Sequence, residues 1–192
     1  MEKLVFATHN LHKKEEVCAM LPAYTILSLS DIGCDTDIPE TGTTFRENAA
    51  LKSRFVYENY HLDCFSDDSG LEVDALNKAP GVYSARYSGI RDDAANLAFL
   101  LQNMAGISER KARFRSVISL IKGGQNYFFE GIVEGTLRNT ASGQQGFGYD
   151  PIFVPDGYTQ TFAEMPLAEK NKISHRAQAM QQLIAFLSGQ SA

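Results

Sequence analysis

The fold class is set near the start of the chain by Lys3-Leu4-Val5-Phe6-Ala7-Thr8-His9-Asn10, a short, mostly apolar run followed by polar residues. This pattern predicts a strand and a polar turn, and helix-forming residues follow over positions 13–21 with apolar positions spaced for one helix face. A second strand is predicted over residues 24–29 and a long helix over residues 45–60. Strands that alternate with helices indicate an α/β fold.

The second half of the chain predicts a hairpin. Residues 112–121 and 127–137 alternate apolar and polar side chains on either side of Lys122-Gly123-Gly124-Gln125. Amphipathic helices are predicted over residues 92–104 and 174–187. The long helix over residues 45–60 is expected to begin at Thr43 as N-cap, with Glu47 in a capping role. We therefore expect one domain over residues 1–192, with an elongated mixed sheet, flanking helices and a hairpin that forms a second lobe.

Composition limits the classes of function. The 192 residues are 44% hydrophobic and 21% charged, as in ordinary folded proteins, and the net charge of −5 argues against nonspecific binding to duplex nucleic acid. Cys18, Cys34 and Cys64 lack the spacing of a zinc site and are interpreted as reduced thiols. No signal peptide or membrane-length apolar run is recognised, so we expect a cytoplasmic protein that does not bind membranes.

The most informative stretch for function is Phe65-Ser66-Asp67-Asp68-Ser69-Gly70-Leu71. Because Asp, Ser and Gly favour turns, we expect two short strands over residues 64–76 with this stretch as the turn between them. Adjacent strand residues point to opposite faces, so one Asp can face a reaction centre while its neighbour supports the turn. Paired carboxylates suit a metal ion, and an ordinary hairpin turn is the alternative interpretation.

Other segments carry groups that suit a nucleotide. Residues 8–13 join a strand end to a helix start, where backbone N–H groups favour a phosphate, although an ordinary N-cap explains them equally well. Glu40 is a loop carboxylate that either reaches a metal ion or is solvated. Between two glycines, the Phe147 ring either stacks on a base or anchors the loop in the core. Hydrogen-bond donors that suit a carbonyl oxygen gather near one helix start: Lys170, Lys172, His175 and Arg176. A solvated helix terminus is the alternative interpretation, and it is the better one for Lys172.

Together these segments resemble the inosine triphosphate pyrophosphatase family, whose members hydrolyse non-standard purine nucleoside triphosphates. The resemblance covers nearly the whole chain. One departure is His12, where the family usually has glycine. The matching pieces, in order, are Ala7-Thr8-x-Asn10-x-x-Lys13, Glu40-Thr41-Gly42-x-Thr44-Phe45-x-Glu47-Asn48-Ala49, Asp67-Asp68-Ser69-Gly70-Leu71, Pro80-Gly81-Val82-Tyr83-Ser84-Ala85-Arg86-Tyr87, Gly146-Phe147-Gly148-Tyr149-Asp150-Pro151 and Ser174-His175-Arg176.

The resemblance implies two lobes around a central nucleotide cleft, a homodimer, and conversion of a nucleoside triphosphate and water to a monophosphate and pyrophosphate. It implies that Asp68 is the general base and a metal contact, with Glu40 assisting a magnesium (Mg²⁺) site. The triphosphate would lie against Thr8, His9, Asn10, Leu11, His12 and Lys13, with Lys52 and Ser69 nearby. The base would be held by Phe147, Gly148, Tyr149, Asp150, Lys170, His175 and Arg176.

The residue types support this chemistry without the resemblance. Magnesium prefers carboxylate, water and phosphate oxygens, as the acidic stretch offers. Hypoxanthine and xanthine carry a carbonyl acceptor at position six, where adenine carries an amino donor. Donors at Lys170, His175 and Arg176 therefore favour oxo-purines, whereas rejection of guanine, which shares that oxygen, needs another feature.

Two other functions compete. A pyrophosphatase of the related septum-inhibitor type would act on modified pyrimidines or other nucleotides, and the Phe-Gly-Tyr-Asp and Ser-His-Arg runs argue against it. A noncatalytic nucleotide-binding module is the second competitor, and the paired acids argue against that. A pyrophosphate-release assay would separate all three.

Overall fold

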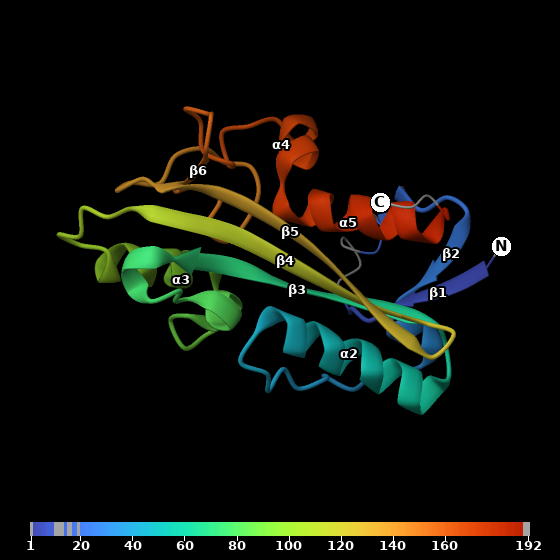
Figure 1. The fold of residues 1–192 in the computed structure, drawn as a ribbon. Coiled ribbons are helices and arrows are strands. Elements are labelled where there is room, and N and C mark those ends of the chain that lie inside the picture. Colours follow the sequence, from blue (N-terminus) through green and yellow to red (C-terminus); the bar gives the residue numbers. More distant parts are fainter. Residues whose placement is uncertain (1, 10–13, 15–16, 19, 190–192) are drawn as a thin grey trace. The chain divides into compact units, whose positions relative to one another are not determined.

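The computed structural model describes residues 2–9, 14, 17–18 and 20–189. Over these residues it is a mixed α/β structure with a sheet in the order β2-β1-β3-β4-β5-β6 and helices beside it (Figure 1). The strands are β1 Glu2–Phe6, β2 Tyr24–Leu27, β3 Cys64–Val73, β4 Lys111–Lys122, β5 Gln125–Leu137 and β6 Phe153–Pro155. The α-helices are α2 Phe45–Tyr60, α3 Asp93–Asn103, α4 Leu167–Ile173 and α5 His175–Leu187, and the 3-10 helices are η1 Ser30–Ile32, η2 Asp74–Leu76 and η3 Gly81–Arg86.

The sheet is mixed. β1 pairs in parallel with both β2 and β3, whereas β5 and β6 are antiparallel. Gly123 and Gly124 alone join β4 to β5, and a two-residue turn between sheet neighbours makes an antiparallel hairpin. The predicted fold class and the predicted hairpin are therefore confirmed.

The chain divides into two compact units. Unit 1 contains Met1–Asp68, Val117–Phe129 and Ala179–Ala192, and unit 2 contains Ser69–Ser116 and Glu130–Gln178. The strands β3, β4 and β5 each contribute residues to both units. The expectation of one domain over residues 1–192, with two lobes around a cleft, stays a prediction.

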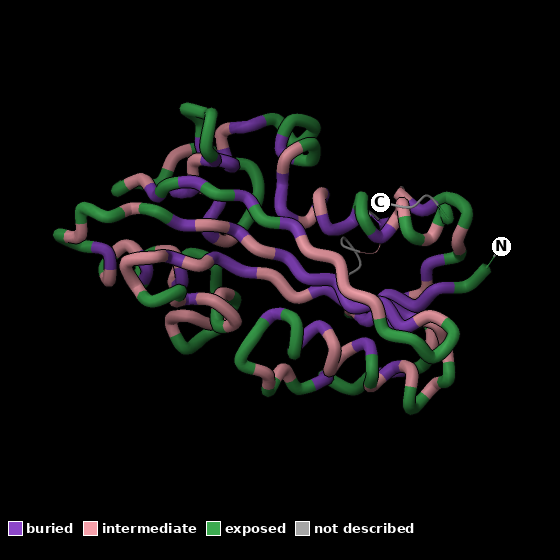
Figure 2. Tube along the Cα trace, viewed as in Figure 1, coloured by how far each residue is buried: buried purple, intermediate pink, exposed green. Residues whose placement is uncertain are grey.

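The core of unit 1 lies on both faces of its part of the sheet, as the alternation of strand side chains requires. One set of buried side chains packs with the end of α5: Leu4, Phe6, Phe65, Ile118, Leu120, Ala179, Met180 and Leu183. The other set packs with α2 and the loop before it: Val5, Ala7, Leu29, Cys34, Val56, Cys64 and Ile121. Figure 2 shows long buried stretches in β3 and β4, whereas β5 and the helices also carry exposed positions.

Unit 2 has its own core, built around aromatic rings. The Phe114 ring lies 4.7 Å from the Phe153 ring and 5.9 Å from the Phe162 ring, measured between centroids. All three rings are buried. Leu71 and Val73 of β3 and Leu100 of α3 complete this cluster. The predicted amphipathic helix over residues 92–104 is thus confirmed as α3, with Asp92 as its N-cap.

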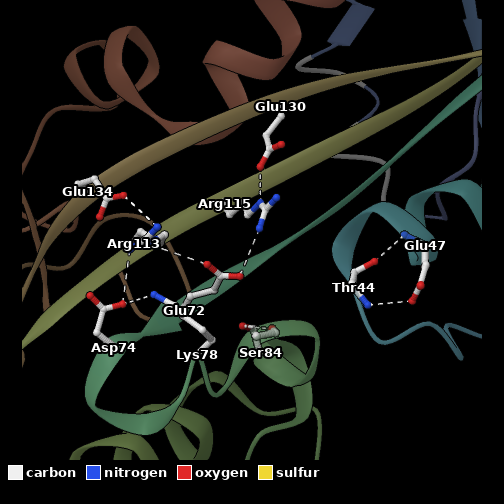
Figure 3. Close-up of polar contacts among 11 residues, drawn as sticks. Thr44, Glu47, Glu72, Asp74, Lys78, Ser84, Arg113, Arg115, Glu130 and Glu134 are labelled. Carbon is white, nitrogen blue, oxygen red and sulfur yellow. Dashed lines mark hydrogen bonds and ion pairs between the residues drawn. The ribbon is translucent and has the colours of Figure 1, made fainter.

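A row of charged side chains lies along the sheet in unit 2 (Figure 3). Arg113 lies 3.5 Å from a carboxylate oxygen of Asp74 and 3.3 Å from one of Glu134. Arg115 pairs with Glu130 and lies 3.7 Å from Glu72. Because these side chains are partly exposed, each pair contributes little to stability, and the row chiefly favours this register of β3, β4 and β5.

The prediction of two strands around a turn at Asp67-Asp68-Ser69-Gly70 is wrong. These residues lie inside β3, which runs without a break from Cys64 to Val73. The glycine serves a close contact instead of a turn: a Cβ on Gly70 would lie 2.3 Å from Ser84 Oγ and 2.7 Å from the Gly81 carbonyl oxygen. The glycine at position 70 therefore reflects the close approach of η3 to the strand.

The helix starts need one further correction. Thr44, not Thr43, is the N-cap of α2, because its hydroxyl accepts from the Glu47 N–H in a complete capping box (Figure 3). The prediction that Glu47 has a capping role is confirmed. In the first predicted helix, the Leu21 N–H donates to the Val17 carbonyl, but much of residues 13–21 lies outside the described part of the chain.

The other boundaries differ slightly from expectation. β2 ends at Leu27, two residues before the predicted end, because η1 follows almost at once. Across the described residues, no helix is both long enough and apolar enough to cross a membrane.

Candidate functional site

Unit 1 contains a cluster of acids around one lysine, which we call the acidic cluster: Glu40, Asp67 and Asp68 around Lys52. The ammonium group of Lys52 donates to Glu40 Oε1 at 2.6 Å and to the backbone carbonyl of Asp67 at 2.6 Å. Lys52 comes from α2, Glu40 from the loop before α2, and the two aspartates from β3. The structure thus brings together residues that the sequence separates by up to 28 positions.

The electrostatics of this cluster favour a second cation. Burial raises the pKa of Asp68 to about 6, Lys52 opposes this shift, and the charges of Glu40 and Asp67 add to it. Burial lowers the pKa of Lys52, but the charges of Asp67, Asp68 and Glu40 raise it by more, so the lysine stays protonated. With every group ionised, three carboxylates surround a single ammonium.

Local structure explains why these groups converge. Asn48 and Lys52 are four residues apart on α2 and so share one helix face. The Asn48 side-chain oxygen accepts from the Gly42 N–H at 2.8 Å, which holds the loop that carries Glu40. Asn48 also acts to lower the pKa of Asp68, although burial outweighs this effect. Asn48 thus holds the loop that carries Glu40 and lies close enough to Asp68 to influence its pKa.

The donor set fits magnesium better than a transition metal. Among the described residues, no group of three or more His, Cys, Asp and Glu side chains forms a ready metal cage. Magnesium is commonly held by only one or two carboxylates together with waters and substrate phosphates. Glu40 and Asp68 supply such hard oxygen donors beside an excess of negative charge. The predicted metal contacts are therefore compatible with the geometry and stay a prediction.

Only part of the predicted phosphate segment can be placed. The carbonyl of Thr8 accepts from the Leu29 N–H, and His9 Nε2 lies 3.1 Å from the Thr36 carbonyl oxygen. Thr8 is partly buried and His9 is exposed. The remaining predicted residues, Asn10, Leu11, His12 and Lys13, lie outside the described residues.

Unit 2 contains a second candidate cluster, which we call the cationic cluster: Lys170 and Arg176 near Phe147, with His175 next to Arg176 at the start of α5. The Lys170 ammonium lies 5.3 Å and the Arg176 guanidinium carbon 5.6 Å from the centroid of the Phe147 ring. The Phe147 residue is 59% exposed. The alternative that Phe147 anchors its loop in the core is therefore wrong, and a role as a stacking surface stays a prediction.

Asp150 organises the loop that carries Phe147, residues 146–150. Its Oδ2 accepts from the Phe147 N–H at 2.9 Å and also pairs with the Lys170 ammonium. Lys170 and Asp150 are both buried, so this pair is shielded from solvent. A Cβ on Gly146 would lie 2.1 Å from Asp150 Oδ2, which explains the glycine at that position. A single carboxylate oxygen of Asp150 thus holds both the backbone of Phe147 and the ammonium group of Lys170.

The rest of this loop is tied to neighbouring elements. Tyr149 is buried in the core of unit 2, and its hydroxyl donates to the Ser84 carbonyl at 2.8 Å. Burial raises the pKa of Tyr149, and nearby Tyr87 and Asp93 raise it further. The Gly148 N–H donates to Asp93 Oδ2 at 3.0 Å. Asp93 lies 55 positions away, and no local pattern could have indicated this contact.

The remaining predicted residues lie at the start of α5. His175 is buried, and its ring stacks on Phe114 at 4.9 Å. Arg176 donates to Ser69 Oγ at 3.3 Å, and Ser69 directly follows Asp68 in β3. By contrast, the Lys172 side chain is 67% exposed and pairs with Glu169, which confirms the interpretation of Lys172 as a solvated residue.

Comparison with known proteins identifies the family. The model of the Ham1 family matches residues 4–186. Proteins named dITP/XTP pyrophosphatase from Christiangramia forsetii and Porphyromonas gingivalis are each 52% identical to this chain, over 97% of its length and 99% and 98% of theirs. The solved structure of the Staphylococcus aureus Ham1 protein superposes with a TM-score of 0.94 at 39% identity, covering 99% of this chain and 100% of that one. The Coxiella burnetii HAM1 structure gives a TM-score of 0.93 at 38% identity, with 98% and 100% covered. With a family model that matches nearly its whole length and relatives at 52% identity, this chain belongs to the Ham1 family.

Proposed function

We propose that this protein is a nucleoside-triphosphate pyrophosphatase that hydrolyses ITP, dITP and XTP to the monophosphate and pyrophosphate, and so removes deaminated purines from the nucleotide pool. The observation that carries the proposal is the acidic cluster, in which Glu40, Asp67 and Asp68 surround a partly buried Lys52. Such a cluster suits hydrolysis of an anhydride bond between phosphates. Relatives named dITP/XTP pyrophosphatase at 52% identity support the same substrate class.

The cofactor proposed is magnesium. Glu40 and Asp68 would hold the ion together with phosphate oxygens, and the ion would supply charge neutralisation as the anhydride bond breaks. This assignment rests on the hard oxygen donors and on the negative charge that Lys52 leaves uncompensated.

In the proposed reaction, Asp68 orients a water molecule and accepts its proton as that water attacks the triphosphate. Lys52 has two roles: it holds the strand at Asp67 through the backbone carbonyl, and it balances the negative charge beside Asp68. Thr8 to Lys13 would contact the phosphates, because a strand end followed by a helix start offers backbone N–H groups to an anion.

Recognition of the base is assigned to the cationic cluster. Lys170 has three N–H groups and gives one to Asp150, which leaves donors for the carbonyl at position six of an oxo-purine. Arg176 and His175 lie at the adjoining helix start, and Phe147 offers an exposed ring on which the base can stack. With ATP, the amino group at position six cannot accept from the buried Lys170, so that contact would be lost at a cost of about 1–3 kcal/mol.

Two further properties are proposed from the family resemblance. We expect a homodimer, and we expect the protein to act in the cytoplasm. The cysteines Cys18, Cys34 and Cys64 are all free, which suits a reducing compartment.

A substrate panel tests the proposal. Purified protein is incubated with magnesium and with ITP, XTP, GTP, ATP or a modified pyrimidine triphosphate, and the products are separated by ion-exchange chromatography. We expect pyrophosphate and IMP in equal amounts from ITP. Preferred hydrolysis of the pyrimidine would instead support the septum-inhibitor type, and tight binding of ITP without any product would support a binding module.

A further inference from the structure

The peptide groups on both sides of Phe147 are held by carboxylates. The Phe147 N–H belongs to the preceding peptide group and donates to Asp150 Oδ2 at 2.9 Å. The Gly148 N–H belongs to the following peptide group and donates to Asp93 Oδ2 at 3.0 Å. Fixing both peptide planes fixes the backbone dihedral angles of Phe147, and with them the direction of its Cα–Cβ bond. The direction in which the exposed side chain leaves the backbone is therefore set by two acids.

The two acids differ in where they come from. Asp150 lies inside the loop and is buried, so it moves with the loop and with Lys170. Asp93 is the first residue of α3, a helix that packs into the core of unit 2 through Leu100. The contact between Asp93 and Gly148 therefore attaches the loop to a rigid element.

A neighbouring contact supports this attachment. The Tyr149 hydroxyl donates to the carbonyl of Ser84, which lies on η3 (Figure 3), and the charge of Asp93 is close enough to help raise the pKa of Tyr149. The Ser84 hydroxyl in turn accepts from the Leu71 N–H at 2.9 Å. Gly148 and Tyr149 are thus both anchored outside the loop, immediately after Phe147.

We propose that Asp93 is a positioning residue for base recognition: by holding the Gly148 N–H, it keeps the Phe147 ring in the orientation that accepts the purine. This inference rests on the proposed function. Asp93 acts through the loop backbone and leaves the attacking water and the phosphates to the acidic cluster. Its loss should therefore weaken substrate binding without slowing the chemical step.

The chain offers a matched control beside it. Asp92 is the N-cap of α3 and accepts from the Ala95 N–H at 2.7 Å, so it stabilises the helix without touching the loop. Asp93→Ala removes the contact to Gly148, Asp93→Asn retains an oxygen that can accept it, and Asp92→Ala removes the cap alone.

The experiment measures kcat and KM for ITP with magnesium, the melting temperature, and hydrogen exchange of the Gly148 amide by NMR. For Asp93→Ala we expect a KM raised about 3- to 10-fold, as the net contribution of one solvent-exposed hydrogen bond predicts, with kcat within about twofold and faster Gly148 exchange. Asp93→Asn should restore most of the KM. Asp92→Ala should lower the melting temperature and leave the KM unchanged.

Several results would overturn the proposal. An unchanged KM in Asp93→Ala, or an equal rise of KM in Asp92→Ala, would show that Asp93 does not position the ring. Failure of Asp93→Asn to restore binding would show that the acceptor oxygen is not what matters. If the variants give any of these contrary KM results while wild-type protein still converts ITP to IMP and pyrophosphate, only the positioning role of Asp93 is refuted. If wild-type protein does not hydrolyse ITP, the proposed function fails and the role of Asp93 fails with it.

Discussion

Replacing Phe147 by alanine separates a ligand-binding ring from a structural one. The residue is 59% exposed, so the Phe147→Ala variant should fold nearly as well as wild-type protein. Its affinity for ITP should fall, because the ring would no longer cover the purine. Stability and binding are thus expected to respond very differently to one substitution.

The two magnitudes follow from the exposure of the ring. Roughly two fifths of a phenylalanine surface of about 200 Å² is buried, about 80 Å², which at about 25 cal/mol per Å² gives an upper bound of about 2 kcal/mol for the loss of stability. Truncation of a core phenylalanine costs about 3–5 kcal/mol. Loss of base stacking costs about 1–3 kcal/mol in binding, or about 5- to 150-fold in KM.

Urea denaturation measures the stability, and steady-state kinetics with ITP measure the binding. Tyr158→Ala is a suitable control, since Tyr158 is also an exposed aromatic residue of unit 2, at 45%, and should leave the ITP kinetics unchanged. A stability loss above about 3 kcal/mol with unchanged ITP kinetics would refute the reasoning, because a core residue behaves in that way.

Three other predictions concern single side chains. Asp68→Asn should lower turnover about 10²- to 10⁴-fold while the melting temperature stays close to wild type, since an amide cannot accept the proton of water; near-normal turnover would remove Asp68 from the mechanism. Arg176→Ala should reduce the ratio of kcat/KM for ITP to that for ATP more than it alters the magnesium requirement, and the reverse pattern in a magnesium titration would argue against a role in base recognition. The hydrogen bond from Ser142 does most to lower the pKa of Glu164 to about 2, so Glu164 contributes stability above pH 4.5 that is lost as the pH falls toward 2. Urea titrations of wild type and Glu164→Gln should therefore converge over that range, and a gap independent of pH would contradict the assignment.

Elements with strong local patterns could be predicted from the sequence. The alternation of residues 112–137 around Gly123 and Gly124 specifies β4 and β5, because a period of two and a two-residue turn both act locally. The length of α2 was also predictable from its helix-forming residues and its capping box. The N-cap was misplaced by one residue because Thr43 and Thr44 offer the same hydroxyl, and only the backbone conformation decides between them.

Elements set by distant contacts could not be predicted. The sequence around Gly70 has the composition of a turn, but the segment is a continuous strand, and its glycine leaves room for Ser84 and Gly81 of η3. The sheet pairs of β3 outweigh the local preference of Asp, Ser and Gly. No pattern near residue 70 contains that information.

The candidate site shows the same division. Asp68, Lys170 and Arg176 could be selected by residue type and by the family resemblance. The pairing of Lys170 with Asp150 could not be predicted from the sequence, because the buried Asp150 lies 20 positions away and only the fold brings the two together. The contact of Asp93 with Gly148 likewise depends on how α3 packs, and a sequence reader has no reason to prefer Asp93 over Asp92.

The most direct test of the proposed function compares two substrates with wild-type protein. Specificity constants for ITP and ATP are measured at equal magnesium, and both pyrophosphate and orthophosphate are quantified in each reaction. We predict at least about a tenfold preference for ITP, as one unmet donor contact of about 1.4 kcal/mol requires, with one pyrophosphate released for each IMP formed. Equal specificity constants for ITP and ATP, or orthophosphate as the main product, would contradict the account.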